Sequence, residues 1–453
     1  MTPFYDLLGG GGGDGGGTTG PDIEVDRINE AQIGRMIEAT MAPRSVGAVR
    51  CYAHLIHGQS DALGADGDPA ISIVPSHGNK MFTPIGVRTQ NTTSAAQFAA
   101  LGDHVEATQE TSAYGSAEAV CRLYEQDGGL ALGQSAGAFF QISAASGFGG
   151  MRVDEIDDPS DMWTALMLGL EKAIAYAGTT IDVSLLTLIC DKADYRDGTP
   201  GATYKTNVEA LRVAYQTAAR TFTGNASLVC KILAPQGVSF AVYDDTTVGV
   251  PGQPTIALAQ LELARDNPNY ILSGPTYDQA WVSGIHENNV GYHEMGVRNG
   301  IYRYRELILG VASPPMYLDQ VTWASGKREV YARVANVGPL GLVFDEENVA
   351  PAPAKGVTVW VNPASTRFSN PGDERAISKV ELGGPDIIKI TMVDPLTVAP
   401  DVRAGWYGTT ALTAGKLTGP RTNIRRRFGH VIDTMHGRIT RYDWLPVCRF
   451  TAS

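Results

Sequence analysis

Residues 46–64 read VGAVRCYAHLIHGQSDALG, an apolar run that ends in a Gly-Gln-Ser turn. The apolar part has the length and composition of a buried strand, and the glycine after it allows the chain to turn tightly. In an open α/β sheet, binding and catalytic sites form at the carboxyl ends of strands. The stretch therefore predicts a sheet edge that presents the hydroxyl group of Ser60, a candidate nucleophile.

The chain that follows alternates strand-like and helix-like segments. The strand-like segments cover residues 138–147, 181–190, 226–236 and 269–274, and the helix-like segments cover 161–178, 207–221 and 255–267. Apolar strands separated by amphipathic helices are typical of a doubly wound, mostly parallel sheet with helices on both faces. We therefore expect one α/β domain over residues 46–312, with a flavodoxin-like, three-layer arrangement.

The pattern changes near Ser313, where the helical periodicity disappears. Short alternating runs at 328–336, 341–345, 356–362, 379–384 and 386–393 are separated by Gly, Pro, Asn and Asp. This pattern favours an antiparallel β-sandwich domain over residues 313–453. At the other end, the glycine-rich residues 9–20 predict a flexible N-terminal arm over 1–20, and a short helix or connector follows over 21–45.

Composition limits the functions that the chain can have. The net charge of −12 over 453 residues argues against a nucleic-acid surface, which needs clustered Lys and Arg. The five cysteines lack the spacing of a disulfide framework or a metal site, so we expect free thiols, no metal and no cofactor. We also expect no membrane span and no signal peptide, because the N-terminus has neither a basic region nor a long apolar run.

A nucleophilic serine needs a base that lies close in space. The best candidate is His286 in VSGIHENNVGYHEMG, residues 282–296, and His293 in the same stretch is a second choice. The structural alternative is that Ser60 only caps its turn and that His286 is an ordinary hydrogen-bonding histidine on a loop. The residues alone leave both interpretations open.

Three stretches together resemble the SGNH hydrolases, and in particular the carbohydrate esterases and the sialate O-acetylesterase-like proteins. They are GQSDALG at 58–64, SAASGFGGMRVDEI at 143–156 and GIHENNVGYHEMG at 284–296. The resemblance covers roughly residues 46–305. It implies that Ser60 is the nucleophile, that His286 is the base, and that Gly149 or Gly150 donates a backbone N–H to the oxyanion hole.

The sequence departs from that family at three places. Asp61 replaces the usual Asn, residues 190–192 read Cys-Asp-Lys where His-Gly-Glu is usual, and Ser283 replaces the Asp three residues before the histidine. A charge on Asp61 would oppose an oxyanion, and a histidine without its carboxylate loses orientation. We therefore expect weak or lost activity. In an active enzyme, Lys192 would replace an oxyanion donor, and the acid would be one of Asp61, Asp278, Glu287 and Glu294.

The C-terminal part resembles the β-sandwich that follows SGNH domains in phage and prophage tail proteins, with GPRTNIR at 419–425 as its most specific motif. The resemblance implies a virion protein, a tail fibre, spike or baseplate subunit, that binds host surface polysaccharide through a degenerate site. The arm would bind other tail proteins, and fibres of this kind form homo-oligomers, usually trimers. The alternatives are an active carbohydrate O-acetylesterase on capsule or lipopolysaccharide, with Ser60 and His286, and a free bacterial esterase.

Overall fold

The computed structural model describes residues 51–127, 140–177, 181–241, 253–367, 370–408 and 414–452. The predicted arm and connector, and the first residues of the opening strand, lie outside these ranges.

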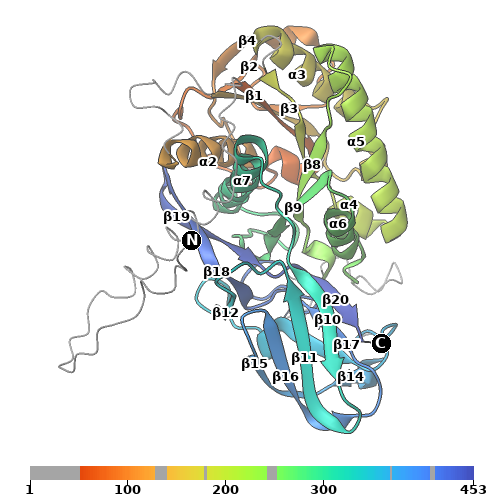
Figure 1. Cartoon of the computed structure of the whole chain (residues 1–453). Coiled ribbons are helices and arrows are strands. Elements are labelled where there is room, and N and C mark those ends of the chain that lie inside the picture. The colour runs from red at the N-terminus through yellow and green to blue at the C-terminus, as the bar shows by residue number, and fades with distance from the viewer. Residues whose placement is uncertain are drawn as a thin grey trace, which may run out of the picture.

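A nine-stranded sheet forms the first part of the described chain (Figure 1). Its strand order is β4-β2-β5-β1-β7-β8-β9, with β3 beside β5 and β6 beside β1. The paired strands run parallel except for β4, which is antiparallel to β2. The bounds are β1 Cys51–Gly58, β2 Lys80–Pro84, β3 Arg88–Gln90, β4 Phe98–Asp103, β5 Phe140–Gly147, β6 Ile181–Asp182, β7 Leu185–Ile189, β8 Lys231–Gln236 and β9 Tyr270–Pro275. The predicted doubly wound, mostly parallel sheet is confirmed, with β1 buried along its whole length at the centre.

Helices cover both faces of this sheet. They are α2 Ser112–Gln126, α3 Asp161–Ala177, the short α4 Lys192–Arg196, α5 Gly201–Thr223, α6 Thr255–Asp266 and α7 Asn289–Arg303. Apolar side chains of α3, α5 and α6 form a core with one face of the strands, and those of α2 and α7 form a second core with the other face. The three layers are the arrangement that the alternating pattern predicts.

Helix α2 and strands β2 to β4 were not expected from the sequence. Seven of the 15 residues of α2 are Gly, Ala, Ser or Cys, so few large apolar side chains mark its buried face. It packs closely on α7, because Gly296 has no side chain where a Cβ atom would lie 2.4 Å from the Ser112 carbonyl oxygen. The backbones of α2 and α7 therefore pack directly against each other, without large apolar side chains between them at this point.

The second part of the chain contains antiparallel sheets, as expected. The last turn of the α/β part, a π-helix, ends at Leu309, and the first antiparallel strand begins at Tyr317, so the predicted boundary falls between them. Three sheets have the orders β10-β11-β16-β15, β12-β18-β19 and β14-β13-β17-β20. The strands are β10 Tyr317–Trp323, β11 Lys327–Ala335, β12 Leu342–Phe344, β13 Val357–Trp360, β14 Glu374–Arg375, β15 Ile377–Leu382, β16 Ile387–Leu396, β17 Asp401–Ala404, β18 Ile424–Thr434, β19 Gly437–Trp444 and β20 Cys448–Thr451. Side chains of the first and third sheets share one core.

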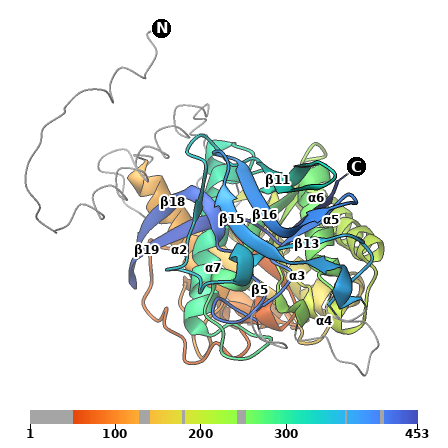
Figure 2. The same cartoon turned by 90° about the horizontal axis from the view of Figure 1, so that it is seen from below.

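The hairpin of β18 and β19 connects the two parts of the molecule. Figures 1 and 2 show both strands leaving the antiparallel region and running alongside α2. At the tip, the N–H of Met435 donates to Glu118 Oε1 on α2 over 2.7 Å, and Ser72 Oγ lies 3.3 Å from His436 Nε2. The antiparallel part is therefore hydrogen-bonded to a helix that covers the parallel sheet.

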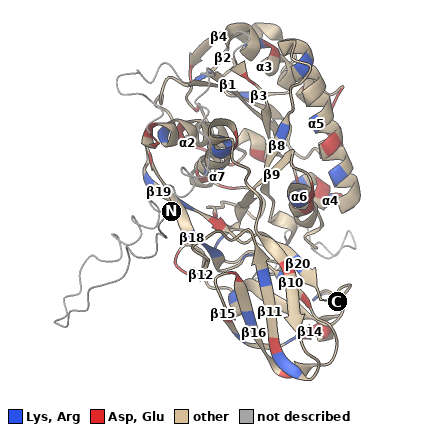
Figure 3. Cartoon of the chain, viewed as in Figure 1, with Lys and Arg blue, Asp and Glu red and all other residues tan. Residues whose placement is uncertain are grey.

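Positively and negatively charged residues are interspersed along both parts of the described chain (Figure 3). None of the described helices combines the length and the apolar character needed to cross a membrane. Among the described residues, no group of three or more His, Cys, Asp and Glu side chains is arranged to hold a metal ion.

Candidate active site

The turn after β1 places Ser60 at the carboxyl end of the central strand. Gly58 ends the strand with φ +156°, and a Cβ atom there would lie 2.0 Å from the carbonyl oxygen of Ile189 on the neighbouring strand. The N–H of Gln59 donates to the same oxygen over 3.0 Å. A 3-10 turn, Ser60–Leu63, begins at once. Only glycine fits this close approach, which brings Ser60 to the edge of the sheet.

Ser60 belongs to a continuous hydrogen-bonded chain of three side chains. Its Oγ lies 2.9 Å from Nε2 of His286, and the Nδ1 of the same ring lies 2.8 Å from Oδ2 of Asp66. The His286 side chain is 15% exposed and that of Asp66 is 54% exposed. The structure thus brings the two sequence-predicted residues together and adds a carboxylate behind the imidazole.

Asp66 comes from the same turn as the serine. The N–H of Ala65 donates to the Ser60 carbonyl over 3.0 Å, and the N–H of Gly67 donates to that of Gly64 over 3.0 Å. Asp66 itself has φ +62°, a left-handed conformation that Asp adopts more readily than most residues. Sequence reasoning missed this acid. The signal was the turn ADGDP directly after the serine block, which places Asp at a sharp reversal.

The four acids proposed from the sequence each have another partner. Asp61 and Glu287 pair with Lys192, Asp278 pairs with Arg298, and Glu294 pairs with Arg441. We expected one of these four acids to orient His286. The carboxylate that contacts the ring is that of Asp66 instead.

Ser283, which stands where the family has the acid, shapes the histidine loop. Its Oγ accepts hydrogen bonds from the backbone N–H groups of Ile285 at 3.3 Å and His286 at 3.0 Å. The N–H of Val282 in turn donates to the carbonyl of His286 over 3.1 Å. Ser283 is thus a turn-forming residue rather than an acid.

Lys192 has a position different from the expected oxyanion donor. Its ammonium group donates to Asp61 Oδ1 over 2.6 Å and to the carbonyl of Ile285, and it lies 3.5 Å from Glu287 Oε2. Its side chain is 7% exposed. Because Asp61 follows Ser60 and Ile285 precedes His286, this one ammonium group joins the serine turn to the histidine loop.

The buried charges around Lys192 are matched. Burial alone would raise the pKa of Asp61, but Lys192, His286 and the hydroxyl of Tyr292 hold that pKa below its ordinary value. Burial alone would lower the pKa of Lys192, but Asp61 and Glu287 raise it. The charge on Asp61, which we expected to oppose an oxyanion, is therefore compensated by a neighbouring ammonium group.

Two further carboxyl groups line a small cavity beside this ion pair. Burial raises the pKa of Glu287 to about 8 and that of Asp191 to about 7. Both line the same small cavity as Asp61 and Lys192. Near neutral pH the cluster therefore holds one ammonium, one carboxylate and two carboxyl groups that retain protons for much of the time.

Two backbone segments, the turn after β1 and the loop after β5, border the Ser60 side chain. A Cβ atom at Gly149 would lie 3.7 Å from the Ser60 Cβ atom, so the loop after β5 borders the serine. The carbonyl of the neighbouring Gly150 accepts a hydrogen bond from Arg196 over 3.1 Å, which fixes that loop. The first N–H groups of a helical turn have no partner within the turn, so the N–H of Ser60 and the loop of Gly149 are candidate oxyanion donors.

The second candidate base, His293, lies in another cluster. It is buried on α7, with Nδ1 at 3.5 Å from Glu110 Oε1 and at 3.4 Å from Ser72 Oγ. Its ring also packs edge-on against His436 of the hairpin tip. His286 is therefore the histidine that the structure brings to Ser60.

No protein-family model matches the sequence, and the comparison with curated proteins gives no match. A solved structure of a carbohydrate acetylesterase from Xanthomonas citri is similar, with a TM-score of 0.52 and 14% identity, over 89% of this chain and 80% of that one. The two chains therefore share a fold, a mostly parallel α/β sheet with helices that is followed by antiparallel sheets. A protein from Arabidopsis thaliana also matches, with a TM-score of 0.39 and 13% identity, over 59% of this chain and 100% of that one.

Proposed function

We propose that the protein is a serine esterase that removes O-acetyl groups from carbohydrates. The observation that carries the proposal is the unbroken hydrogen-bonded chain from Ser60 through His286 to Asp66. A nucleophile, a base and an acid that orients the base are the arrangement that activates a serine hydroxyl for acyl transfer.

The chemistry proceeds in two acyl-transfer steps. Ser60 Oγ attacks the carbonyl carbon of the ester while its proton passes to Nε2 of His286. The tetrahedral intermediate then collapses, the sugar oxygen leaves with the proton from His286, and an acetyl-enzyme remains. Water attacks this intermediate with His286 as base, and acetate and the free Ser60 hydroxyl are released. Asp66 keeps the imidazole in the required tautomer and stabilises its cation.

The developing negative charge needs donors aimed at it, which commonly contribute several kcal/mol in such enzymes. We assign this role to the backbone N–H groups of Ser60 and Gly149. Lys192 acts indirectly, because it neutralises Asp61 beside the reacting centre. We therefore describe Lys192 as a positioning residue.

The carbohydrate part of the proposal is supported by the sequence resemblance and by a fold shared with a carbohydrate acetylesterase. One of the three departures that predict a degenerate site is the missing acid at position 283, and Asp66 supplies a carboxylate to His286 instead. An active enzyme is therefore the better proposal.

The virion assignment stays a prediction. The glycine-rich arm that would bind other tail proteins lies outside the described residues. If the protein is a tail component, its esterase substrate would be an acetylated capsule or lipopolysaccharide on the host surface.

The test is hydrolysis of p-nitrophenyl acetate and of an acetylated polysaccharide by the purified full chain. We expect turnover by the wild type and its loss in Ser60→Ala and His286→Ala, whereas Ser94→Ala, at an exposed serine, retains activity. No turnover by the wild type on either substrate, or undiminished turnover by Ser60→Ala, would contradict the proposal.

A further inference from the structure

The loop that carries His286 is a closed turn whose two ends lie side by side. Trp281 and Glu287 form an isolated antiparallel bridge across it. Just outside this bridge, the N–H of Asn288 donates to the carbonyl of Ala280 over 3.0 Å. The position of the imidazole ring therefore depends on what holds this turn against the rest of the molecule.

Trp281 holds the turn against the α/β part. Its Nε1–H group donates to the carbonyl of Thr276 over 3.1 Å. The ammonium group of Lys192 lies 4.9 Å from the centre of the indole ring, within the range of a cation–π interaction. The same ammonium group donates to Asp61 and to the carbonyl of Ile285. The indole ring therefore contacts the cation that joins the serine turn to the histidine loop.

A further contact of Trp281 comes from the antiparallel part. Gly415 is buried and has φ +87°, and a Cβ atom there would lie 2.7 Å from Cδ1 and 2.9 Å from Cγ of the indole ring. Glycine is therefore the residue that lets this backbone lie directly against the ring. Trp281 also packs against an apolar cluster that both parts share, with Tyr277 from the first part and Trp444 from the second.

We propose that Trp281 is a positioning residue of the esterase site and that the antiparallel part sets its place through Gly415. This inference rests on the proposed function, because it concerns the geometry of Ser60 and His286. A displaced indole ring would shift the turn and its contact with Lys192 together. A misplacement of about 1 Å can lower the rate of catalysis about 100-fold. The antiparallel part then contributes to the chemistry as well as to stability.

The first variant is Gly415→Ala, which changes no residue of the α/β part. The added methyl group would overlap the indole ring, so the ring must move. We expect kcat on p-nitrophenyl acetate to fall at least about tenfold, with KM changed by less than about threefold. Because this substrate contains no sugar, such a loss reports the geometry of acyl transfer rather than the binding of carbohydrate.

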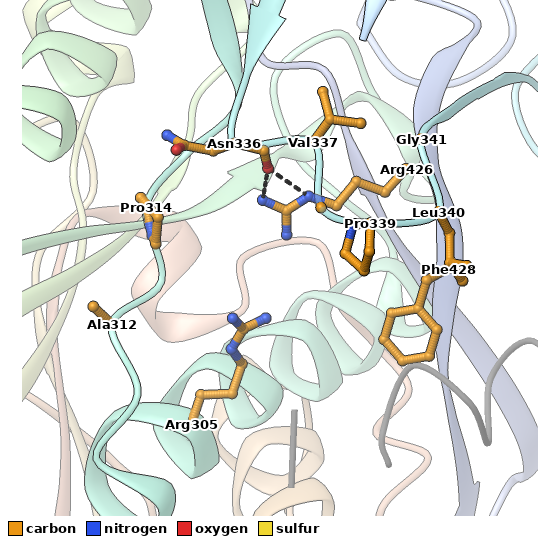
Figure 4. A pocket seen from close by; sticks show the side chains of 11 residues that line it. Arg305, Ala312, Pro314, Asn336, Val337, Pro339, Leu340, Gly341, Arg426 and Phe428 are labelled. Atoms are coloured by element: carbon orange, nitrogen blue, oxygen red, sulfur yellow. Dashed lines mark hydrogen bonds between the residues drawn. The ribbon is translucent and has the colours of Figure 1, made fainter. Parts of the chain in front are cut away.

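Gly338→Ala is the matched control for backbone strain. Gly338 has φ +84°, so alanine is strained there to a similar degree, but a Cβ atom would meet nothing within 4 Å. This glycine lies in the turn 336–341, which lines a cavity at another contact between the two parts. Figure 4 shows that contact, where Arg426 Nε donates to the carbonyl of Asn336 over 3.1 Å. Gly338→Ala should retain kcat within about twofold.

Two variants test the ring itself and do not depend on the folding of Gly415→Ala. Trp281→Phe keeps an aromatic face for Lys192 and should lower kcat by less than about threefold, whereas Trp281→Leu removes that face and should lower kcat at least about tenfold. Trp323→Leu, at another half-buried tryptophan on β10, is the control and should leave kcat unchanged. Urea unfolding of each variant shows that the protein assayed is folded.

Three results would overturn the inference while the wild type remains active. The first is a folded Gly415→Ala protein with the kcat of the wild type. The second is an equal loss of kcat in Gly338→Ala. The third is a Trp281→Leu protein in which only KM for the acetylated polysaccharide rises, because the ring would then be a sugar contact. Absence of turnover by the wild type would instead overturn the proposed function, and this inference with it.

Discussion

Ser60 and Asp66 lie six residues apart in one turn and contact opposite nitrogen atoms of the same imidazole ring, that of His286. The nucleophile and the acid are thus placed relative to each other by a single local structure. The histidine is the only member that arrives from a distant loop. Tertiary contacts must therefore hold its ring between Ser60 Oγ and Asp66 Oδ2.

Asp66→Asn should lower kcat by about 10- to 100-fold on p-nitrophenyl acetate. An amide keeps the left-handed backbone conformation but cannot stabilise the histidine cation. The loss should be smaller than that of a buried triad acid, because the Asp66 side chain is half exposed and water screens its charge. Asp68→Asn, at an exposed carboxylate two residues away, is the control and should retain wild-type kcat. Equal effects of the two variants would remove Asp66 from the mechanism.

Lys192→Met should destabilise the fold by about 3–5 kcal/mol in urea unfolding, because it leaves the Asp61 carboxylate buried without a cation. The double variant Lys192→Met with Asp61→Asn should recover a large part of that loss. Lys205→Met, which removes an ammonium group from a solvent-exposed pair with Glu262, should cost less than about 1 kcal/mol. If the double variant loses as much unfolding free energy as the two single variants lose together, the two charges act independently.

Stability should fall as pH rises from about 5 to 8. The folded-state pKa values of Glu287 and Asp191 are raised by burial to about 8 and about 7, so the folded state binds more protons in this window than the unfolded state. The unfolding free energy then decreases with pH by up to about 1.4 kcal/mol per unit for each group. Glu287→Gln should reduce this slope in thermal unfolding followed across the same pH range. A slope unchanged by the variant would mean that Glu287 is not the group that titrates.

Ser283→Ala should lower stability by about 0.5–1.5 kcal/mol and reduce kcat modestly, because two backbone N–H groups of the histidine loop lose their acceptor. Ser283→Asn should stay near wild type, since an Asn side chain makes the same kind of turn. Parallel urea unfolding and ester hydrolysis measure both effects. Equal loss in the two variants would indicate that the serine hydroxyl has another role.

The strands and turn around Ser60 could be predicted because their signals are local. An apolar run that ends in glycine specifies a buried strand with a tight turn, and β1 and its turn have that form. Helix α2 could not be found in this way, because small residues that allow close contact with α7 make up much of its buried face. Local signals alone also do not fix the roles of Asp66 and Lys192. Each has its role only through a residue more than ninety positions away, His286 or Ile285.

The β18–β19 hairpin makes the C-terminal region unsuitable as a removable module. Its tip supplies the backbone donor for Glu118, a buried carboxyl group on α2, and α2 in turn supports the helix that begins just after His286. A shortened protein that ends after the parallel sheet would expose the surface under the hairpin and leave Glu118 without this bond. Anyone who wishes to transplant the hydrolase half into another scaffold must therefore transplant the hairpin with it, or redesign the face of α2 that the hairpin covers.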